Sequence, residues 1–308
     1  MAKLKRAVVI GCGGALGGAW AAAALRSAEN RLNWDLRNAD VIIGTSAGAV
    51  LGSLLSAGVS VDEIAHWQGG HSKSVFAEDA ASVPSLPPRP KAALTAPGLI
   101  TSLLKRKISL MTALSGMLPE GTSDMQGFVD LIDSVVPPGQ WTRHPATWLM
   151  VVDAANGQRV ALGYPGSPPI AMNKAVCASY AVPGWCPPVE HAGRRYIDGG
   201  AASPASADLL ISTDVSEAIV IAPMASTDMG MPRNAAEAAE RLLRKQMTRI
   251  VEKEIRQLEQ AGIRVRKLYP GRVDLDAIGY NLMDRSKRHS VYETALRTTE
   301  EAVSRWRV

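Results

Sequence analysis

The chain has 308 residues, of which 46% are hydrophobic and 20% are charged. This composition suits a globular protein that buries a core, and it excludes a disordered or collagen-like chain. The formal net charge of +5 identifies no partner by itself, and no nucleic-acid-binding motif accompanies it, so we expect no nucleic acid partner. The length fits one domain or one domain with a cap, and we expect a single domain over residues 1–308.

Two apolar runs near the N-terminus each predict a buried strand followed by a buried helix. Ala7–Ile10 is a short apolar strand, and an alanine-rich helix follows over Gly17–Arg31. The pattern recurs with a strand at Val41–Ile43 and a helix over Ser46–Ala57. Strands that alternate with helices indicate βαβ units. The sequence therefore predicts an α/β fold with a mostly parallel central sheet.

The same two runs resemble a signal peptide and a membrane-spanning helix in their sequence. Lys3, Lys5 and Arg6 precede the apolar run Ala7–Leu25 in the manner of a signal peptide. Val41–Val59 is nearly long enough to span a bilayer. Glycines interrupt both runs, and each costs an isolated helix about 1 kcal/mol, so we expect elements of a globular core instead. The three cysteines form no C-x-x-C pair, which favours a reducing compartment, and we expect a cytoplasmic protein.

The middle of the chain predicts a cap. Prolines recur between Pro84 and Pro97 and exclude a regular element there. A loop of this length in a compact domain is usually functional. We therefore expect residues 72–117 to form a cap or lid insertion, with an amphipathic helix over Leu99–Leu114 that carries Lys105, Arg106 and Lys107.

The rest of the chain predicts further strands and helices. Asp124 is the expected N-cap of a helix over Met125–Val136. Asn156-Gly157 is a hairpin-turn signal between candidate strands Trp148–Val152 and Arg159–Leu162. The remaining elements are strands at Arg195–Ile197 and Ala218–Ala222 and helices at Ile170–Ser179, Asn234–Gln260 and Ser290–Arg305. Basic residues cluster in this part, and we expect them on solvated helix faces: Arg241, Arg244, Lys245, Arg249, Arg264, Arg266, Lys267, Arg285, Lys287 and Arg288.

A G-x-S-x-G sequence, Gly44-Thr45-Ser46-Ala47-Gly48, lies between a predicted strand and a predicted helix. This is the context of a nucleophile elbow, in which a sharp turn exposes the serine hydroxyl. Glycines on both sides leave room where a Cβ would clash with the strand and the helix. The helix N-terminus also favours a developing negative charge. The alternative is a tight turn in which Ser46 is only an N-cap.

A glycine-rich loop follows the first predicted strand. Its residues, Gly11-Cys12-Gly13-Gly14-Ala15-Leu16-Gly17, offer backbone N–H groups to an anion or an oxyanion. A dinucleotide fingerprint that starts at Gly11 would need glycine or alanine where the chain has Leu16. The sequence therefore disfavours a nucleotide site.

The third motif is Asp198-Gly199-Gly200, directly after the predicted strand Arg195–Ile197. A carboxylate at the end of a strand, followed by two glycines, can approach a neighbouring loop closely. The alternative is an ordinary turn aspartate, because Asp-Gly is a common turn pair.

These three motifs in this order resemble the patatin-like phospholipase family over roughly Ala7 to Leu210. Ala178–Gly184 (ASYAVPG) is also similar to the segment that precedes the family's aspartate. The resemblance implies a three-layer α/β/α sandwich and a Ser46–Asp198 dyad that cleaves lipid carboxylic esters without a histidine. It also implies an oxyanion hole at Gly13 and Gly14. The supporting motif glycines are Gly11, Gly44, Gly48, Gly199 and Gly200.

Two departures from the family pattern stand out. Leu16 occupies a position where the family usually carries arginine or lysine, which removes a positive charge near the glycine-rich loop. The family often has an asparagine and a proline after the D-G-G motif. This chain has Ser203 and Pro204 instead, at a different spacing from the motif. A weakly active, lipid-binding or regulatory protein is therefore one alternative function.

A second alternative is a Ser-His-Asp esterase. The histidines are His66, His71, His144, His191 and His289, and only His289 follows Asp198 in the chain order of α/β-hydrolases. No His, Cys or Asp cluster has metal-ligand spacing, so we expect neither metal nor cofactor. The expected partner is a lipid ester substrate, with peripheral membrane contact through Trp67 and the apolar helix near Leu103. Trp185 is expected in the core or beside the acyl chain.

Overall fold

The computed structural model describes residues 4–70, 75–77, 83–104 and 108–307. Its strands are β1 (Arg6–Ile10), β2 (Val41–Thr45), β3 (Thr147–Asp153), β4 (Arg159–Leu162), β5 (Val189–His191), β6 (Arg194–Asp198), β7 (Glu217–Ile221) and β8 (Arg264–Leu268). Its helices are α1 (Gly14–Leu32), α2 (Ala47–Ser56), α3 (Val61–Gln68), α4 (Gly98–Leu104), α5 (Leu110–Gly116), α6 (Gln126–Asp133), α7 (Met172–Ser179), α8 (Ala235–Gln260), α9 (Arg272–Ile278) and α10 (Arg288–Ser304).

One sheet runs through the molecule in the order β5-β6-β3-β2-β1-β7-β8, and β4 also pairs with β3. The neighbours from β3 through β2, β1 and β7 to β8 all pair in parallel. Strands β4 and β6 each pair antiparallel with β3, and β5 pairs antiparallel with β6. The expected α/β fold with a mostly parallel central sheet is confirmed.

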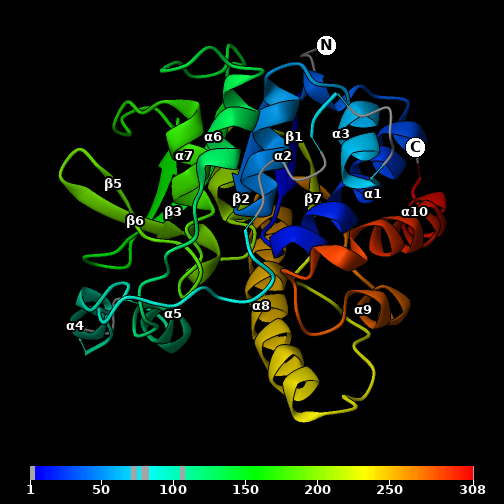
Figure 1. The fold of residues 1–308 in the computed structure, drawn as a ribbon. Coiled ribbons are helices and arrows are strands. Elements are labelled where there is room, and N and C mark those ends of the chain that lie inside the picture. Colours follow the sequence, from blue (N-terminus) through cyan, green and yellow to red (C-terminus); the bar gives the residue numbers. More distant parts are fainter. Residues whose placement is uncertain (1–3, 71–74, 78–82, 105–107, 308) are drawn as a thin grey trace.

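Helices cover both faces of this sheet. Along β1, Val8 and Ile10 belong to one core cluster, whereas Ala7 and Val9 belong to another, because successive side chains of a strand point to opposite faces. The first cluster contains residues of α1, α2, α3, α6, α7, α9 and α10, and the second contains residues of α8. Figure 1 shows the first half of α8 extending past the sheet, on the same side of the molecule as α4 and α5. The result is three layers, helix, sheet and helix.

Several predicted helix boundaries differ from the structure. The predicted helix Leu99–Leu114 is wrong as one element: α4 ends at Leu104, and α5 starts after Ser109, whose Oγ accepts a hydrogen bond from the Thr112 N–H. Lys105, Arg106 and Lys107 lie outside the described residues. The helix assigned to Met125–Val136 is shorter, Gln126–Asp133, and Asp124 accepts from the Gln126 N–H at 2.9 Å instead of being its N-cap.

The expectation that the C-terminal basic residues lie on solvated faces is wrong for two of them. Arg244 has an exposed fraction of 0%, and Arg288 has one of 6%. The Arg244 guanidinium donates to Glu240 Oε1 at 2.7 Å and to the Pro223 carbonyl. A buried arginine needs such partners because an unpaired charge away from water is very costly.

The apolar runs that imitate membrane segments form strands and helices of the core. Ala7–Ile10 and Val41–Ile43 lie in β1 and β2, in the middle of the sheet. Across the four described ranges, no helix combines the length and the apolar character needed to cross a bilayer.

Candidate active site

Strand β3 brings Ser46 and Asp198 together. Met150 of β3 pairs with Thr45 at the end of β2, and the next residue, Val151, pairs with Asp198 at the end of β6. Because β4 pairs with β3 over Leu149–Val152 and occupies one side, β2 and β6 must share the other side. The two strands therefore meet end to end, and the nucleophile candidate and its carboxylate partner lie at that junction. They also line one cavity.

The turn after β2 holds Ser46 in an unusual backbone conformation, with φ 57° and ψ −120°. Such a conformation costs a non-glycine residue about 1–3 kcal/mol, so the surrounding structure must impose it. A Cβ on Gly48 would lie 2.0 Å from the Ile10 carbonyl oxygen, and a Cβ on Gly44 would lie 2.6 Å from the Ala49 Cα. Only glycine fits on either side of this turn. This geometry is that of a nucleophile elbow.

Ser179, at the end of α7, fixes the backbone of the elbow. Its Oγ accepts a hydrogen bond from the Ser46 N–H at 2.9 Å and donates one to the Met150 carbonyl at 2.7 Å. Ser179 is fully buried, so water cannot replace either bond. Ser179 stood in the ASYAVPG segment of the sequence, but nothing in that segment indicated this contact.

Replacing Ser179 is expected to disturb the nucleophile more than the fold. Ser179→Ala leaves the buried Ser46 N–H without its acceptor, and one such loss costs about 1–3 kcal/mol. We expect kcat for ester hydrolysis to fall about 10- to 100-fold, with KM changed less than about threefold. The matched control is Ser53→Ala in α2, because Ser53 is equally buried and its Oγ has no partner among the described residues. Equal kcat values for the two variants would contradict the role of Ser179.

The glycine-rich loop between β1 and α1 lies beside Ser46. The Gly11 N–H donates to the Ile221 carbonyl and the Cys12 N–H to the Pro204 carbonyl, both at 2.8 Å, so the loop is fixed at its start. Within the described part of the chain, no hydrogen bond uses the N–H of Gly13 or Gly14. Both glycines line the cavity that contains Ser46 and Asp198. Their N–H groups are therefore available to bind an oxyanion.

Asp198 is buried, with an exposed fraction of 5%. Burial raises the pKa of Asp198 to about 7, although hydrogen bonds from the Ser46 hydroxyl and the Gly200 N–H oppose this rise. The Gly200 N–H donates to Asp198 Oδ1 at 2.7 Å. A Cβ on Gly199 would lie 2.4 Å from the Met150 carbonyl oxygen, and one on Gly200 would lie 2.9 Å from Cys12 Sγ. The two glycines thus allow the carboxylate to approach β3 and the glycine-rich loop.

An apolar cavity of about 550 Å³ opens onto these groups. Most of its other lining residues are large and apolar, and they come from α5, α8, the loop before β5 and the segments that follow β7 and α9. They include Met111, Leu114, Val182, Trp185, Met224, Met247, Leu282 and Met283. Trp185 lines the cavity and also packs against the first core cluster, so it occupies both of its expected places. A cavity of this size and character accommodates an aliphatic chain.

The remaining sequence candidates lie elsewhere. His289 interacts through Nδ1 with the Gly69 carbonyl oxygen at 2.6 Å and does not line the cavity. His71 lies outside the described residues. Trp67 is 2% exposed, so the expectation that it touches lipid is wrong. Leu16 is fully buried in the core.

Ser203 has a structural role that the sequence did not indicate. Its Oγ donates to Glu254 Oε1 of α8 at 2.5 Å, and Glu254 Oε2 accepts from the Ala207 N–H at 3.0 Å. These bonds hold the segment that contains Pro204, whose carbonyl binds the glycine-rich loop. Burial raises the pKa of Glu254. In the described ranges, no three His, Cys, Asp or Glu side chains gather as a metal site would require.

Comparison with known proteins gives one family match. A family model described as "Patatin-like phospholipase" matches residues 8–211. A search of curated proteins found no match.

Thirteen chains of solved structures are similar to this one. VipD from Legionella pneumophila has a TM-score of 0.48 and 12% identity, with 98% of this chain and 66% of VipD covered. The type III effector protein ExoU has a TM-score of 0.35 and 15% identity, with coverages of 98% and 53%. The chain thus spans about two thirds of the VipD chain and about half of the ExoU chain.

Proposed function

The chain belongs to the patatin-like phospholipase family, and we propose that it hydrolyses carboxylic esters of lipids through an acyl-enzyme at Ser46. Membership of the family implies lipid acyl hydrolase activity. One observation supports the specific mechanism: Ser46, Asp198 and the N–H groups of Gly13 and Gly14 line the same apolar cavity. That cavity offers a nucleophile, a base, an oxyanion hole and space for an acyl chain in one place.

The proposed reaction has two halves. Asp198 takes the proton of the Ser46 hydroxyl while Oγ attacks the ester carbonyl carbon, and the N–H groups of Gly13 and Gly14 stabilise the oxyanion. The intermediate collapses, the C–O bond to the alcohol breaks, and Asp198 returns the proton to the leaving oxygen. Water then attacks the acyl-enzyme with Asp198 again as the base, which releases the fatty acid and restores Ser46. A buried carboxylate with a pKa of about 7 is a stronger base than an ordinary aspartate.

The position of His289 disfavours a Ser-His-Asp triad. Its ring interacts with Gly69, and no histidine is among the described residues that line the cavity with Ser46. His289→Gln is therefore expected to keep kcat within about twofold of wild type, because general acid–base catalysis contributes at least about 100-fold where it operates. A loss of 100-fold or more, with the fold intact by circular dichroism, would instead support the triad.

The proposal is tested by measuring fatty acid release from a set of esters. The set contains phospholipids, lysophospholipids, acylglycerols and soluble short-chain esters, and Ser46→Ala purified in the same way controls for contaminating hydrolases. We expect release by wild type and none above background by the variant. If wild type binds these lipids but releases no fatty acid from any of them, the chain is a lipid-binding protein instead of an enzyme.

We further propose that the mouth of the cavity contacts a membrane, and that α4 and α5 belong to a cap over residues 72–117. Leu114 of α5 and Leu243 of α8 line the cavity and are also partly exposed, at 53% and 38%. Beside them, Leu110 of α5 is 61% exposed and Leu242 of α8 is 72% exposed. Exposed leucines around the entrance to an acyl cavity favour contact with the apolar part of a lipid surface.

Membrane contact at these leucines predicts that replacing them lowers activity on lipid vesicles but not on a soluble ester. Leu110→Glu and Leu242→Glu place a charge where the apolar side chain would enter the bilayer, so we expect activity on phospholipid vesicles to fall about tenfold or more. Activity on a soluble short-chain ester is expected to change by less than about twofold. Ile211→Glu is the control, because Ile211 is 44% exposed and does not line the cavity. Equal losses on vesicles and on the soluble ester would contradict membrane contact at these leucines.

A further inference from the structure

A second, smaller cavity lies next to the active site. Its described lining comes from α1, α2, α3, α7 and the segment that leads into α10: Gly14, Ala15, Gly18, Ala47, Val50, Trp67, Gln68, Tyr180, Arg285 and Arg288. Gly14 also lines the large apolar cavity, and Ala47 directly follows Ser46. The two cavities thus adjoin each other at the glycine-rich loop, where Gly14 lines both.

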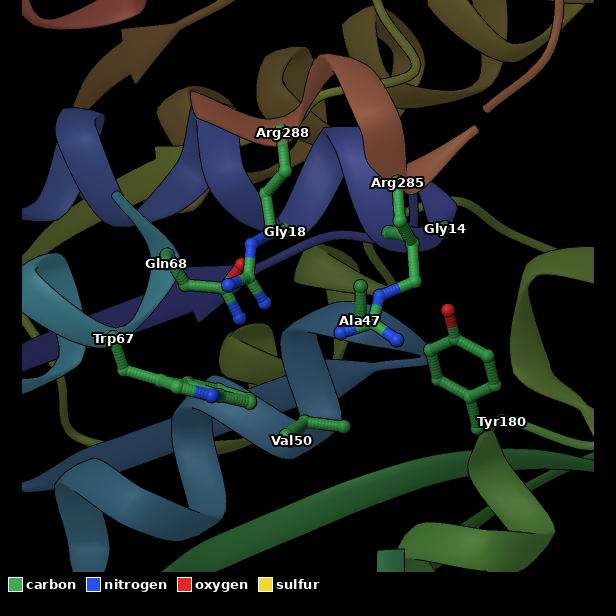
Figure 2. Close-up of a pocket in the computed structure, with 10 residues that line it drawn as sticks. Gly14, Gly18, Ala47, Val50, Trp67, Gln68, Tyr180, Arg285 and Arg288 are labelled. Carbon is green, nitrogen blue, oxygen red and sulfur yellow. The ribbon is translucent and has the colours of Figure 1, made fainter. Parts of the chain in front are cut away.

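Two guanidinium groups from one short segment line this small cavity. Figure 2 shows Arg285 and Arg288 reaching from the C-terminal segment across α1 toward α2 and α3. Arg288 is 6% exposed, so its charge lies away from bulk water. Both arginines also interact with other residues. A guanidinium has five N–H donors, so each arginine can bind an anion and keep those contacts.

Gln68 adds a neutral donor to the same cavity. Its side chain is 7% exposed and lines the cavity (Figure 2). Its amide makes no hydrogen bond within the part of the chain that the structure describes. Because the amide lines the cavity and uses neither N–H on a described residue, it can donate a hydrogen bond to a ligand there. The ten described lining residues include no carboxylate.

We propose that Arg285, Arg288 and Gln68 form a binding subsite for a phosphate group beside the acyl cavity. The volume of about 30 Å³ holds two or three water-sized groups, which suits a compact anion and excludes an acyl chain. Arginine binds phosphate oxygens through parallel N–H donors. The N-termini of α1 and α2, at Gly14 and Ala47, add a favourable field for a negative charge. This assignment rests on the proposed function: the phosphate belongs to the head group of a phospholipid substrate, and the acyl ester of the same molecule lies at Ser46.

Binding of the phosphate itself is measured without any enzymatic turnover. Inorganic phosphate is titrated against sodium chloride of equal ionic strength, and the melting temperature is recorded for wild type, Arg285→Gln, Gln68→Met and Lys287→Gln. We expect phosphate to raise the melting temperature of wild type and Lys287→Gln by about 2 °C or more. The shift should be at least halved in Arg285→Gln and Gln68→Met. Lys287 is the matched control because it is exposed on the same segment and does not line the cavity. Equal shifts in all four proteins, or none in wild type, would overturn the subsite.

The source of the phosphate is decided by a pair of substrates with identical acyl chains. The ratio of kcat/KM for a monomeric dihexanoyl phospholipid to that for dihexanoylglycerol is compared among the same proteins. A ratio that falls about tenfold or more in Arg285→Gln, and stays unchanged in Lys287→Gln, supports the head group as the ligand. An unchanged ratio together with a lost phosphate shift overturns that assignment and leaves free phosphate as the ligand. If wild type hydrolyses neither substrate, the proposed function fails while the phosphate titration still tests the subsite.

Discussion

Ser46→Ala is expected to lower kcat for ester hydrolysis by about 10⁴- to 10⁶-fold, because removal of a serine nucleophile has effects of that size in hydrolases. The reaction then has no route through an acyl-enzyme, and only binding and the oxyanion hole remain. Released fatty acid, measured with enough enzyme to detect residual turnover, checks this loss. A decrease of less than about 100-fold would contradict Ser46 as the nucleophile.

A companion variant separates chemistry from backbone strain at the same position. Alanine keeps the Cβ of Ser46 in a conformation with φ 57°, whereas glycine adopts a positive φ without steric cost. Ser46→Gly is therefore expected to be more stable than Ser46→Ala by about 1 kcal/mol, although both are inactive. Urea denaturation measures this difference, and equal stabilities would show that the elbow stores no strain in this side chain.

Asp198→Asn is expected to lower kcat/KM by about 10²- to 10⁴-fold, the range for loss of a general base. Asparagine still accepts the hydrogen bond from the Gly200 N–H, so the geometry is kept while the base is lost.

The pKa of Asp198 also predicts how the activity of wild type depends on pH. Because burial raises this pKa to about 7, we expect kcat/KM to reach half of its maximum near pH 7. Below that pKa, kcat/KM should fall about tenfold per pH unit because Asp198 becomes protonated. A pH profile in which kcat/KM reaches half of its maximum near pH 4 would contradict the raised pKa of Asp198.

The same pKa predicts a gain of stability in the inactive variant. Between pH 3.8, where an ordinary aspartate loses its proton, and about pH 7, the folded state keeps a proton on Asp198, whereas the unfolded state does not. Stability from this group is therefore greatest below pH 3.8 and is lost as the pH rises through 7. At 1.36 kcal/mol per pKa unit, the buried charge costs wild type up to about 4 kcal/mol above pH 7.

We therefore expect Asp198→Asn to exceed wild type in unfolding free energy by about 1–3 kcal/mol at pH 8, with the difference shrinking toward pH 5. Asp228→Asn, at an exposed carboxylate, controls for the loss of one negative charge. A variant that is less stable than wild type at pH 8 would show that the carboxylate is stabilised in the fold, in conflict with its burial.

The sequence allowed the central sheet and the three motifs to be predicted because they depend on local patterns. Short apolar strands, the elbow glycines and the Asp-Gly-Gly turn are visible within a few residues. Strand β8 was missed because its sequence, Arg264–Leu268, is mostly basic, which hides its apolar side at the edge of the sheet. Helix α3 was missed although Ser60 and Glu63 form a capping box at its start, a signal that could have found it.

The other features that the sequence did not indicate are contacts between segments far apart in the chain. Ser179 reaches Ser46 across 133 positions of the chain, and Ser203 binds Glu254 of α8. Neither pair has a local signature, since both depend on how β3 and α8 pack. Arg285 and Arg288 were expected on solvated surfaces because basic residues in a sequence usually indicate an exposed face. Nothing in that segment of the sequence indicates that it lines a cavity.

The most direct test of the Ser46–Asp198 dyad is covalent labelling with a fluorophosphonate probe, followed by intact mass and by peptide mapping. We predict one adduct on wild type, located on Ser46, with a labelling rate that rises through a midpoint near pH 7. Asp198→Asn should label at least about 100-fold more slowly, and Ser46→Ala should not label at all. No adduct on folded wild type in the presence of lipid vesicles, or labelling of Asp198→Asn at the wild-type rate, would contradict the dyad.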